Sequence, residues 1–282
     1  MKKKTLIIDD IKKEEKKQFI IKLIILLVIF VICVFIGIYM LNVYLVNKEF
    51  SEDIAKISKL NTETIFSIDR IYMYSSADAK TNETNKPIWD LDIFQYTDIA
   101  LYINNREEEG ISYENTIKSL TIDNIKFNGL ETGTASLYYK NVNDFGKLSN
   151  IEENKIDNSL NFNIINSGEV DYAKPELYSN CQNPITLEYV NSNMKEETKI
   201  SDISSPLIYD GSLLKKGGIL LNNIKCTISF RITIINYYNQ KFVATAYIDV
   251  PLEDTFNNNS IYDGKMIKNI ENTNIIKFIR VE

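Results

Sequence analysis

Residues 226–250 read CTISFRITIINYYNQKFVATAYIDV, a stretch in which apolar and polar side chains alternate on both sides of a short polar turn. Apolar residues occupy every second position from Ile228 to Ile234 and again from Phe242 to Val250. This period of two is typical of a strand with one buried and one wet face, so the stretch predicts an antiparallel hairpin. Pro251 has no N–H to donate to a ladder and should mark the end of the second strand.

Shorter apolar segments extend the same prediction to the chain beyond residue 62. Further strands are expected at Ile65–Tyr74, Asp98–Asn104, Ser119–Phe127, Ser136–Lys140, Leu160–Ile165, Ile185–Val190, Leu207–Tyr209 and Ile275–Val281. Turn pairs such as Asn128-Gly129 and Asp210-Gly211 separate them. Many short strands with few helical stretches predict a mainly β domain over residues 63–282, an antiparallel β-sandwich of jelly-roll-like type.

The number of domains in this β part follows less directly from the sequence. A length of about 220 residues suits one large sandwich or two smaller ones. Residues 167–183 are the alternative boundary, but they lack the composition of a linker, so one domain is expected. Residues 141–157 are polar and are expected to form a long loop.

Upstream of the β part, Leu23–Met40 reads LIILLVIFVICVFIGIYM and carries no charged side chain. The uncharged stretch continues to Asn47, 25 residues in all, which is enough for a helix to cross a hydrocarbon core of about 30 Å. We expect a transmembrane helix over 23–46 and a juxtamembrane stalk over 47–62 that extends the helix or forms a short separate segment. The run is too long for the apolar region of a cleaved signal peptide, which favours an uncleaved signal-anchor.

The flanking charges indicate the direction of this span. Residues 1–22 contain eight lysines, whereas the segment after the run is much poorer in positive charge. The positive-inside rule therefore makes residues 1–22 a basic cytoplasmic tail and places the β domain outside the cytoplasm. The predicted location is a cell membrane, crossed once, with the N-terminus cytoplasmic and the C-terminal domain extracytoplasmic.

The net charge and the absence of histidine argue against some classes of function. The formal net charge is −6, and because residues 1–22 carry +4, the remainder carries −10. An acidic outer domain argues against nucleic acid as a partner. The chain has no histidine, which removes the usual general base near neutral pH and the commonest metal ligand. No catalytic, metal or cofactor-binding residue is assigned, and no cofactor is expected.

Five residues are candidates for a site or a cross-link in the outer part. Cys181 and Cys226 could pair as a disulfide in an oxidising compartment, with a buried free thiol as the alternative for Cys226. Trp89, Asp90 and Asp92 combine the chain's single tryptophan with two alternating carboxylates, and they form the candidate ligand surface.

Paired tyrosines are a second aromatic feature. If the segments around Tyr138-Tyr139 and Tyr237-Tyr238 are extended, each pair should direct one ring outward.

Together these features predict a single-pass, membrane-anchored cell-envelope protein. Its acidic β-sandwich would serve binding, adhesion or assembly without enzymatic activity. Expected partners are membrane lipid, through residues 23–46, and protein or glycan on the outer side. Two alternatives stay open: a membrane-tethered hydrolase that uses carboxylates on envelope glycans, and a subunit of a membrane complex.

Overall fold

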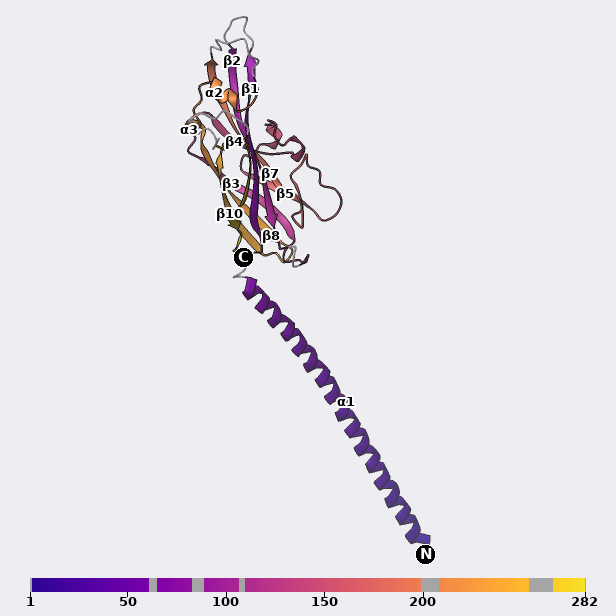
Figure 1. The fold of residues 1–282 in the computed structure, drawn as a ribbon. Coiled ribbons are helices and arrows are strands. Elements are labelled where there is room, and N and C mark those ends of the chain that lie inside the picture. The colour runs from indigo at the N-terminus through magenta and orange to yellow at the C-terminus, as the bar shows by residue number, and fades with distance from the viewer. Residues whose placement is uncertain are drawn as a thin grey trace. The chain divides into compact units, whose positions relative to one another are not determined.

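The computed structural model describes residues 2–60, 65–82, 89–106, 110–198, 208–253 and 266–281. The chain divides into two compact units, Met1–Glu63 and Thr64–Glu282. The first unit is helical and the second is built from strands (Figure 1).

Helix α1, Lys2–Leu60, is continuous from the predicted tail through the span and into the predicted stalk as far as Leu60. Residues Lys16–Leu45 within it are long and apolar enough to cross a membrane, with a mean hydropathy of 3.5. Every side chain from Lys16 to Leu45 is exposed in the structure, so the apolar surface surrounds the helix and has no polar face. An all-round apolar helix belongs in a hydrocarbon environment or a large core. Of the two forms considered for the stalk, the structure has the helical extension.

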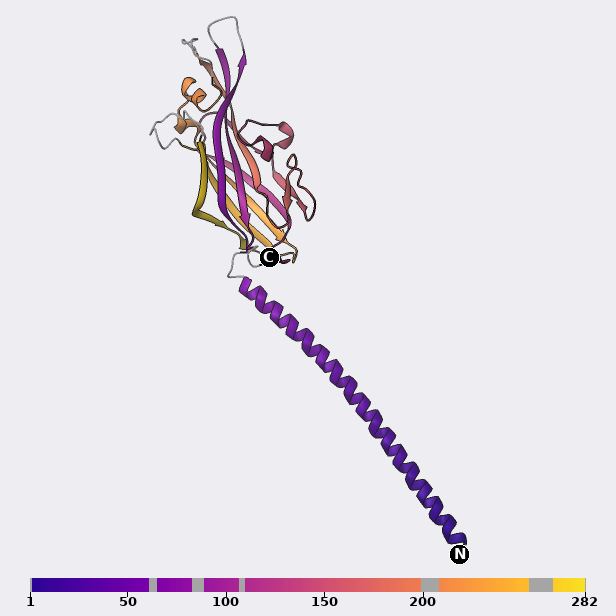
Figure 2. The ribbon, with the colours of Figure 1, turned by 45° about the vertical axis from the view of Figure 1, so that its right-hand side comes forward.

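The second unit contains two sheets within the described residues, which confirms the mainly β prediction. The five-stranded sheet has the order β10-β1-β2-β7-β4 and the six-stranded sheet the order β11-β9-β8-β3-β5-β6. Figure 2 shows the long strands of this unit from a second side. Their strands are β1 (Ser67–Asn82), β2 (Trp89–Asn104), β3 (Ile117–Asn128), β4 (Thr134–Tyr139), β5 (Ser159–Ile165), β6 (Glu176–Tyr178), β7 (Ile185–Thr198), β8 (Cys226–Asn236), β9 (Lys241–Val250), β10 (Met266–Lys277) and β11 (Ile279–Arg280). Two short helices, α2 (Ser212–Lys216) and α3 (Leu221–Ile224), precede β8.

The predicted hairpin over residues 226–250 is present as β8 and β9. Their antiparallel register runs from Cys226 opposite Val250 to Ile235 opposite Lys241. The turn is closed by side chains, because the Asn236 amide donates to Gln240 Oε1 at 2.9 Å and the Gln240 N–H donates to Asn236 Oδ1 at 2.9 Å. Strand β9 ends at the residue before Pro251, as expected from the missing N–H.

Several details differ from the sequence prediction, as the following examples show. Strand β6 pairs with β5 in parallel, so the six-stranded sheet is mixed rather than purely antiparallel. Ile208 and Tyr209, predicted in a strand, lie in irregular structure before α2. Strand β2 begins at Trp89, well before the predicted Asp98. It is a central strand, and its polar residues take part in backbone pairing with β1 on one side and β7 on the other.

Side chains from both sheets meet in the core and make the arrangement a sandwich. Phe66, next to β1, contacts Phe242 of β9 with ring centroids 5.2 Å apart. Phe127 of β3 and Tyr189 of β7 also join the sheets, as a tilted pair with ring centroids 6.0 Å apart. Phe278, also buried against Phe66, lies where the chain passes from β10 in one sheet to β11 in the other. Aromatic pairs of this kind add to the free energy of apolar burial.

Candidate functional site

The densest polar site in the described residues lies on the five-stranded sheet and begins with two carboxylates. Asp98 of β2 is directly opposite Glu188 of β7 in the antiparallel register. Both side chains are completely buried. Like charges at directly opposed positions destabilise a strand pair, and burial strengthens the repulsion. The pair therefore needs a compensating group.

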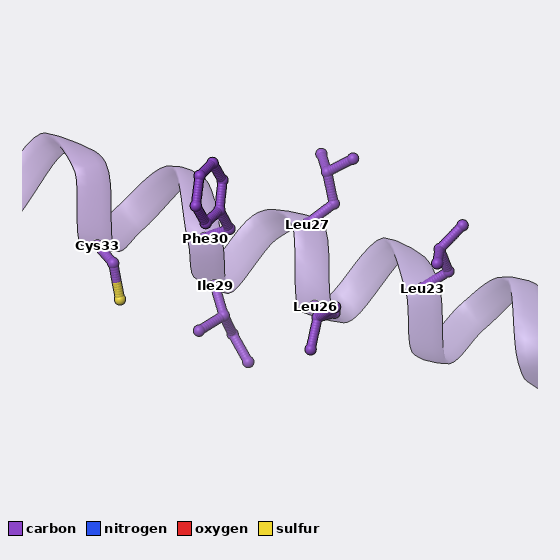
Figure 3. Close-up of a pocket in the computed structure, with 6 residues that line it drawn as sticks. All are labelled: Leu23, Leu26, Leu27, Ile29, Phe30 and Cys33. Atoms are coloured by element: carbon purple, nitrogen blue, oxygen red, sulfur yellow. The ribbon is translucent and has the colours of Figure 1, made fainter.

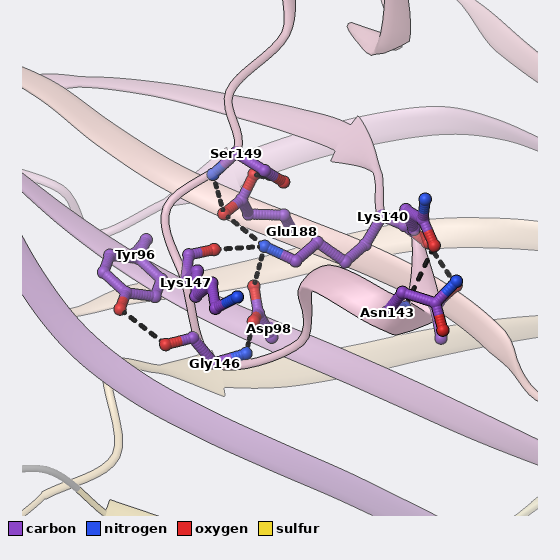
Figure 4. Close-up of polar contacts among 10 residues, drawn as sticks. Tyr96, Asp98, Lys140, Asn143, Gly146, Lys147, Ser149 and Glu188 are labelled. Atoms are coloured by element: carbon purple, nitrogen blue, oxygen red, sulfur yellow. Dashed lines mark hydrogen bonds and ion pairs between the residues drawn. The ribbon is translucent and has the colours of Figure 1, made fainter. Parts of the chain in front are cut away.

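Lys140, the residue after β4, supplies that compensation. Its Nζ lies 2.9 Å from Glu188 Oε1 and 3.2 Å from Asp98 Oδ1, and its side chain is also fully buried. The ammonium group also donates a hydrogen bond to the carbonyl oxygen of Lys147 (Figure 4). The backbone of Lys140 is fixed as well, since its N–H donates to the Thr186 carbonyl at 3.1 Å and its own carbonyl accepts from Thr186 Oγ1 at 2.6 Å. We call Asp98, Lys140 and Glu188 the ion cluster.

The loop after β4 closes over the ion cluster through backbone groups. The Gly146 N–H donates to Asp98 Oδ2 at 2.5 Å, and the Ser149 N–H donates to Glu188 Oε1 at 3.0 Å. Tyr96 Oη donates to the Gly146 carbonyl at 3.1 Å (Figure 4). Each carboxylate thus accepts from the loop and contacts Lys140, which is how buried charge is tolerated.

The surroundings of Asp98 in the ion cluster shift the pKa of its carboxyl group. Burial raises the pKa of Asp98 to about 7, with the Lys140 charge acting in the opposite direction and the Glu188 charge adding to the rise. Burial also raises the pKa of Tyr96. A carboxylic acid that titrates near neutral pH suits acid–base chemistry, but it needs access to a substrate. All three ionic side chains are sealed from solvent, so the arrangement holds a loop in place and exposes no reactive group.

None of the ion cluster was assigned as a site from the sequence, although a signal was there. Glu188 interrupts the apolar run ITLEYV, and Asp98 sits between Thr97 and Ile99 in a segment that is otherwise buried. A charged residue at a core position of a strand is the usual mark of a paired buried charge. The partner could not be found from the sequence, because the pairing depends on strand order.

The predicted ligand surface falls at the start of β2. Asp90 lies opposite Asn82 and Glu197 in the register, and Asp92 lies opposite Lys80 and Lys195. The side chains of Trp89 and Asp90 lie outside the described part of the structure. Asp92 is half-buried. The side chain of Lys80, its register partner on β1, has its Nζ 5.1 Å from the centre of the Phe94 ring. That Trp89, Asp90 and Asp92 form a ligand surface stays a prediction.

Cys181 and Cys226 are both buried thiols, and the structure has no disulfide between them. Cys226 begins β8, next to Tyr189, and burial raises the pKa of its thiol. Cys181 lies in the turn after β6, three strands away from β8 in the sheet order. Three strand spacings are roughly 14 Å, beyond the Cα separation that a disulfide spans.

Helix α1 carries a shallow apolar groove lined by Leu23, Leu26, Leu27, Ile29, Phe30 and Cys33. The six side chains all project from this one helix, on both of its sides, so they enclose no site (Figure 3). Among the described residues, no group of three or more Cys, Asp or Glu side chains is arranged to hold a metal ion.

Comparison of the chain with protein-family models, with curated proteins and with solved structures finds no match.

Proposed function

We propose that this chain is a single-pass cell-envelope protein that displays its acidic β-sandwich outside the cytoplasm for binding, adhesion or assembly, without enzymatic activity. The observation that carries the proposal is the segment Lys16–Leu45, which is apolar and exposed around its whole circumference. At about 25 cal/mol per Å² of apolar surface, leaving such a helix in water would be strongly unfavourable, so lipid is its natural surrounding.

The orientation is supported by charge. Eight lysines precede the apolar segment, and the part of the chain after residue 22 is acidic. Lysines near the end of a span are retained on the cytoplasmic side, which directs residues 64–282 to the other side.

The binding role is supported by exposed aromatic side chains on the β domain. Tyr113 is 66% exposed, Tyr238 53% and Tyr247 70%. Tyr113 and Tyr238 form a pair with ring centroids 6.2 Å apart. Tyrosine offers a rigid ring with a polar end, the combination enriched at interaction surfaces.

In-cell labelling of single introduced cysteines tests the anchor, the orientation and the binding role. Intact cells are treated with a membrane-impermeant benzophenone-maleimide. The native thiols should react little, because Cys181 and Cys226 are buried and Cys33 would lie in lipid. We expect Tyr113→Cys and Tyr247→Cys to be labelled in intact cells, and Lys12→Cys only after permeabilisation. Irradiation should then give a discrete cross-linked adduct from at least one outer site.

Each part of the proposal has its own contradicting result. Release of the unlabelled protein from membranes by alkaline carbonate contradicts the anchor. Labelling of Lys12→Cys in intact cells contradicts the orientation. Efficient labelling at both tyrosine positions without any adduct after irradiation contradicts the binding role.

A further inference from the structure

We propose that residues 141–155 form a pH-sensitive strap across the five-stranded sheet, fastened when the ion cluster holds one extra proton and loosened when that proton leaves. The strap would thereby control exposure of an aromatic face of the sheet. This inference concerns the β domain alone and does not depend on the membrane anchor.

The two ends of the strap are fixed to the sheet independently of the ion cluster. At one end the Lys140 backbone is bonded to Thr186 in both directions. At the other, Lys155 forms a bridge with Tyr138, and the Ile156 N–H donates to the Leu137 carbonyl at 2.8 Å. A segment tied at both ends can open in the middle without unfolding the domain.

The middle of the strap is held mainly by the ion cluster. The Gly146 N–H bonds to Asp98, the Ser149 N–H bonds to Glu188, and the Lys147 carbonyl accepts from Lys140. All three contacts join a backbone group of the strap to an ionised or ionisable side chain. The bonds to Glu188 and Lys140 are charge-assisted and strong. The Gly146 bond by itself favours ionised Asp98, but burial outweighs it and raises the pKa of this carboxyl group.

Under the strap lies a buried cluster made of Phe94, Tyr96, Tyr138 and Val190, with Leu148 of the strap packed against it. The strap also contributes Phe145, whose ring centroid lies 5.8 Å from that of Tyr72. Lifting residues 145–148 would therefore uncover aromatic side chains on β1, β2 and β4. Large exposed apolar patches are rare on soluble domains and mark interaction sites or aggregation-prone surfaces.

The charge balance of the ion cluster provides the trigger. One lysine against two carboxylates leaves a net charge of −1 when all three are ionised, and zero when one proton is added. The groups that act on Asp98 are Lys140, Glu188 and the Gly146 N–H, with Tyr74 opposite it in the register and the charge of Asp98 acting on Tyr96. Lys140 is the single cation in that set. A net charge in a site sealed from water is unfavourable, so loss of the proton weakens the closed state.

The pH window follows from the raised pKa of Asp98, about 7 when the strap is closed. In the open state the carboxyl group returns toward its ordinary value near 4. Opening then becomes about tenfold more favourable per pH unit between roughly pH 4 and pH 7 and levels off above that. Between pH 5 and pH 8 the expected loss of protection is more than tenfold.

Amide hydrogen exchange on the full chain in detergent tests the strap. Exchange of residues 141–150, corrected for the intrinsic pH dependence of exchange, is measured at pH 5 and pH 8. We expect protection of this segment to fall more than tenfold at the higher pH, while the β8–β9 hairpin keeps its protection. Asp98→Asn, which resembles the protonated acid, should keep the segment protected at both values.

Two further variants keep the test decisive if Asp98→Asn folds poorly. Glu188→Gln removes the excess negative charge and should also make protection independent of pH. Lys140→Met leaves both carboxylates without a cation and should loosen the segment at pH 8 beyond the wild-type protein. Equal protection of the wild-type segment at pH 5 and pH 8, or an unchanged pH dependence in both amide variants, would overturn the proposal.

Discussion

Lys140 holds two strands of the five-stranded sheet and the loop after β4 together. It is fully buried, bridges two carboxylates that lie on neighbouring strands, and donates to the loop above them. A lysine is rarely sealed from water unless it is paired. Lys140 needs the carboxylates, and they need Lys140, since neither Asp98 nor Glu188 has another cation in the described contacts.

Replacing this lysine tests its contribution to stability. We expect Lys140→Met to lower the free energy of unfolding by about 3–5 kcal/mol at pH 7, because it keeps the apolar stem but leaves buried carboxylates uncompensated. Chemical denaturation of the full chain in detergent, followed by the signal of the β domain, measures the change. Lys118→Met is the matched control: its exposed Nζ contacts only Asn239 in the hydrogen bonds described, at 2.7 Å, and a change within about 0.5 kcal/mol is expected. A Lys140→Met loss no larger than the control would contradict this role.

At the scale of single elements, the centre of the five-stranded sheet departs from a simple alternating pattern because side chains on both faces are buried there. Tyr138 and Tyr139 were predicted to direct one ring outward, and this is wrong: they are 7% and 3% exposed. Tyr139 contacts Phe162 of the other sheet at 6.2 Å, and Tyr138 lies beneath the strap. In the second tyrosine pair, Tyr238 is exposed, but it lies in the hairpin turn rather than in a strand.

The turn before β4 depends on a glycine for two separate reasons. Gly133 has a φ of +97°, and a Cβ placed there would lie 2.0 Å from Oδ1 of the buried Asn191 side chain. Gly168 has the same φ of +97° and no heavy atom within 4 Å of such a Cβ. The two positions therefore separate backbone strain from steric overlap.

We expect Gly133→Ala to destabilise the β domain more than Gly168→Ala. The shared left-handed φ should cost about 1–2 kcal/mol at each position. Overlap with Asn191 should add about 1–3 kcal/mol at Gly133 alone. Parallel denaturation curves of the two variants give the difference directly, and equal losses would show that Asn191 moves aside freely.

At the scale of the whole molecule, the raised pKa of Asp98 links global stability to pH. The folded domain keeps a proton on Asp98 up to about pH 7, whereas the unfolded chain releases it near pH 4. The folded state therefore binds more protons in this window, so stability is highest at the acidic end and falls as pH rises toward 7. The Arg231 guanidinium, which holds the pKa of Asp123 below its usual value, acts with the opposite sign and only at lower pH.

Thermal unfolding should report this linkage. Between pH 4.5 and pH 7.5 the wild-type domain should lose a few kcal/mol through Asp98, a shift of several degrees in Tm for a domain of this size. Asp98→Asn should remove most of that dependence. Parallel Tm profiles of the two proteins would contradict a raised pKa at this position, whatever the absolute values.

Local patterns in the sequence were sufficient for the N-terminal helix and for the hairpin of β8 and β9. The apolar run at residues 23–46 indicated the helix, because eighteen or more uncharged residues have few alternatives. Alternation over residues 226–250 predicted β8 and β9 with their turn, because a period of two assigns each side chain to a face. Both signals are carried by neighbours along the chain.

What only the tertiary structure decided is which elements meet. Strand order placed β2 beside β7 and β4 at the edge, and this brought Asp98, Glu188 and Lys140 together from positions 42 and 48 residues apart. It also covered both faces at the centre of the five-stranded sheet and separated Cys181 from Cys226. The reason is physical: a strand's alternation specifies that a face is buried, but only long-range pairing specifies what buries it.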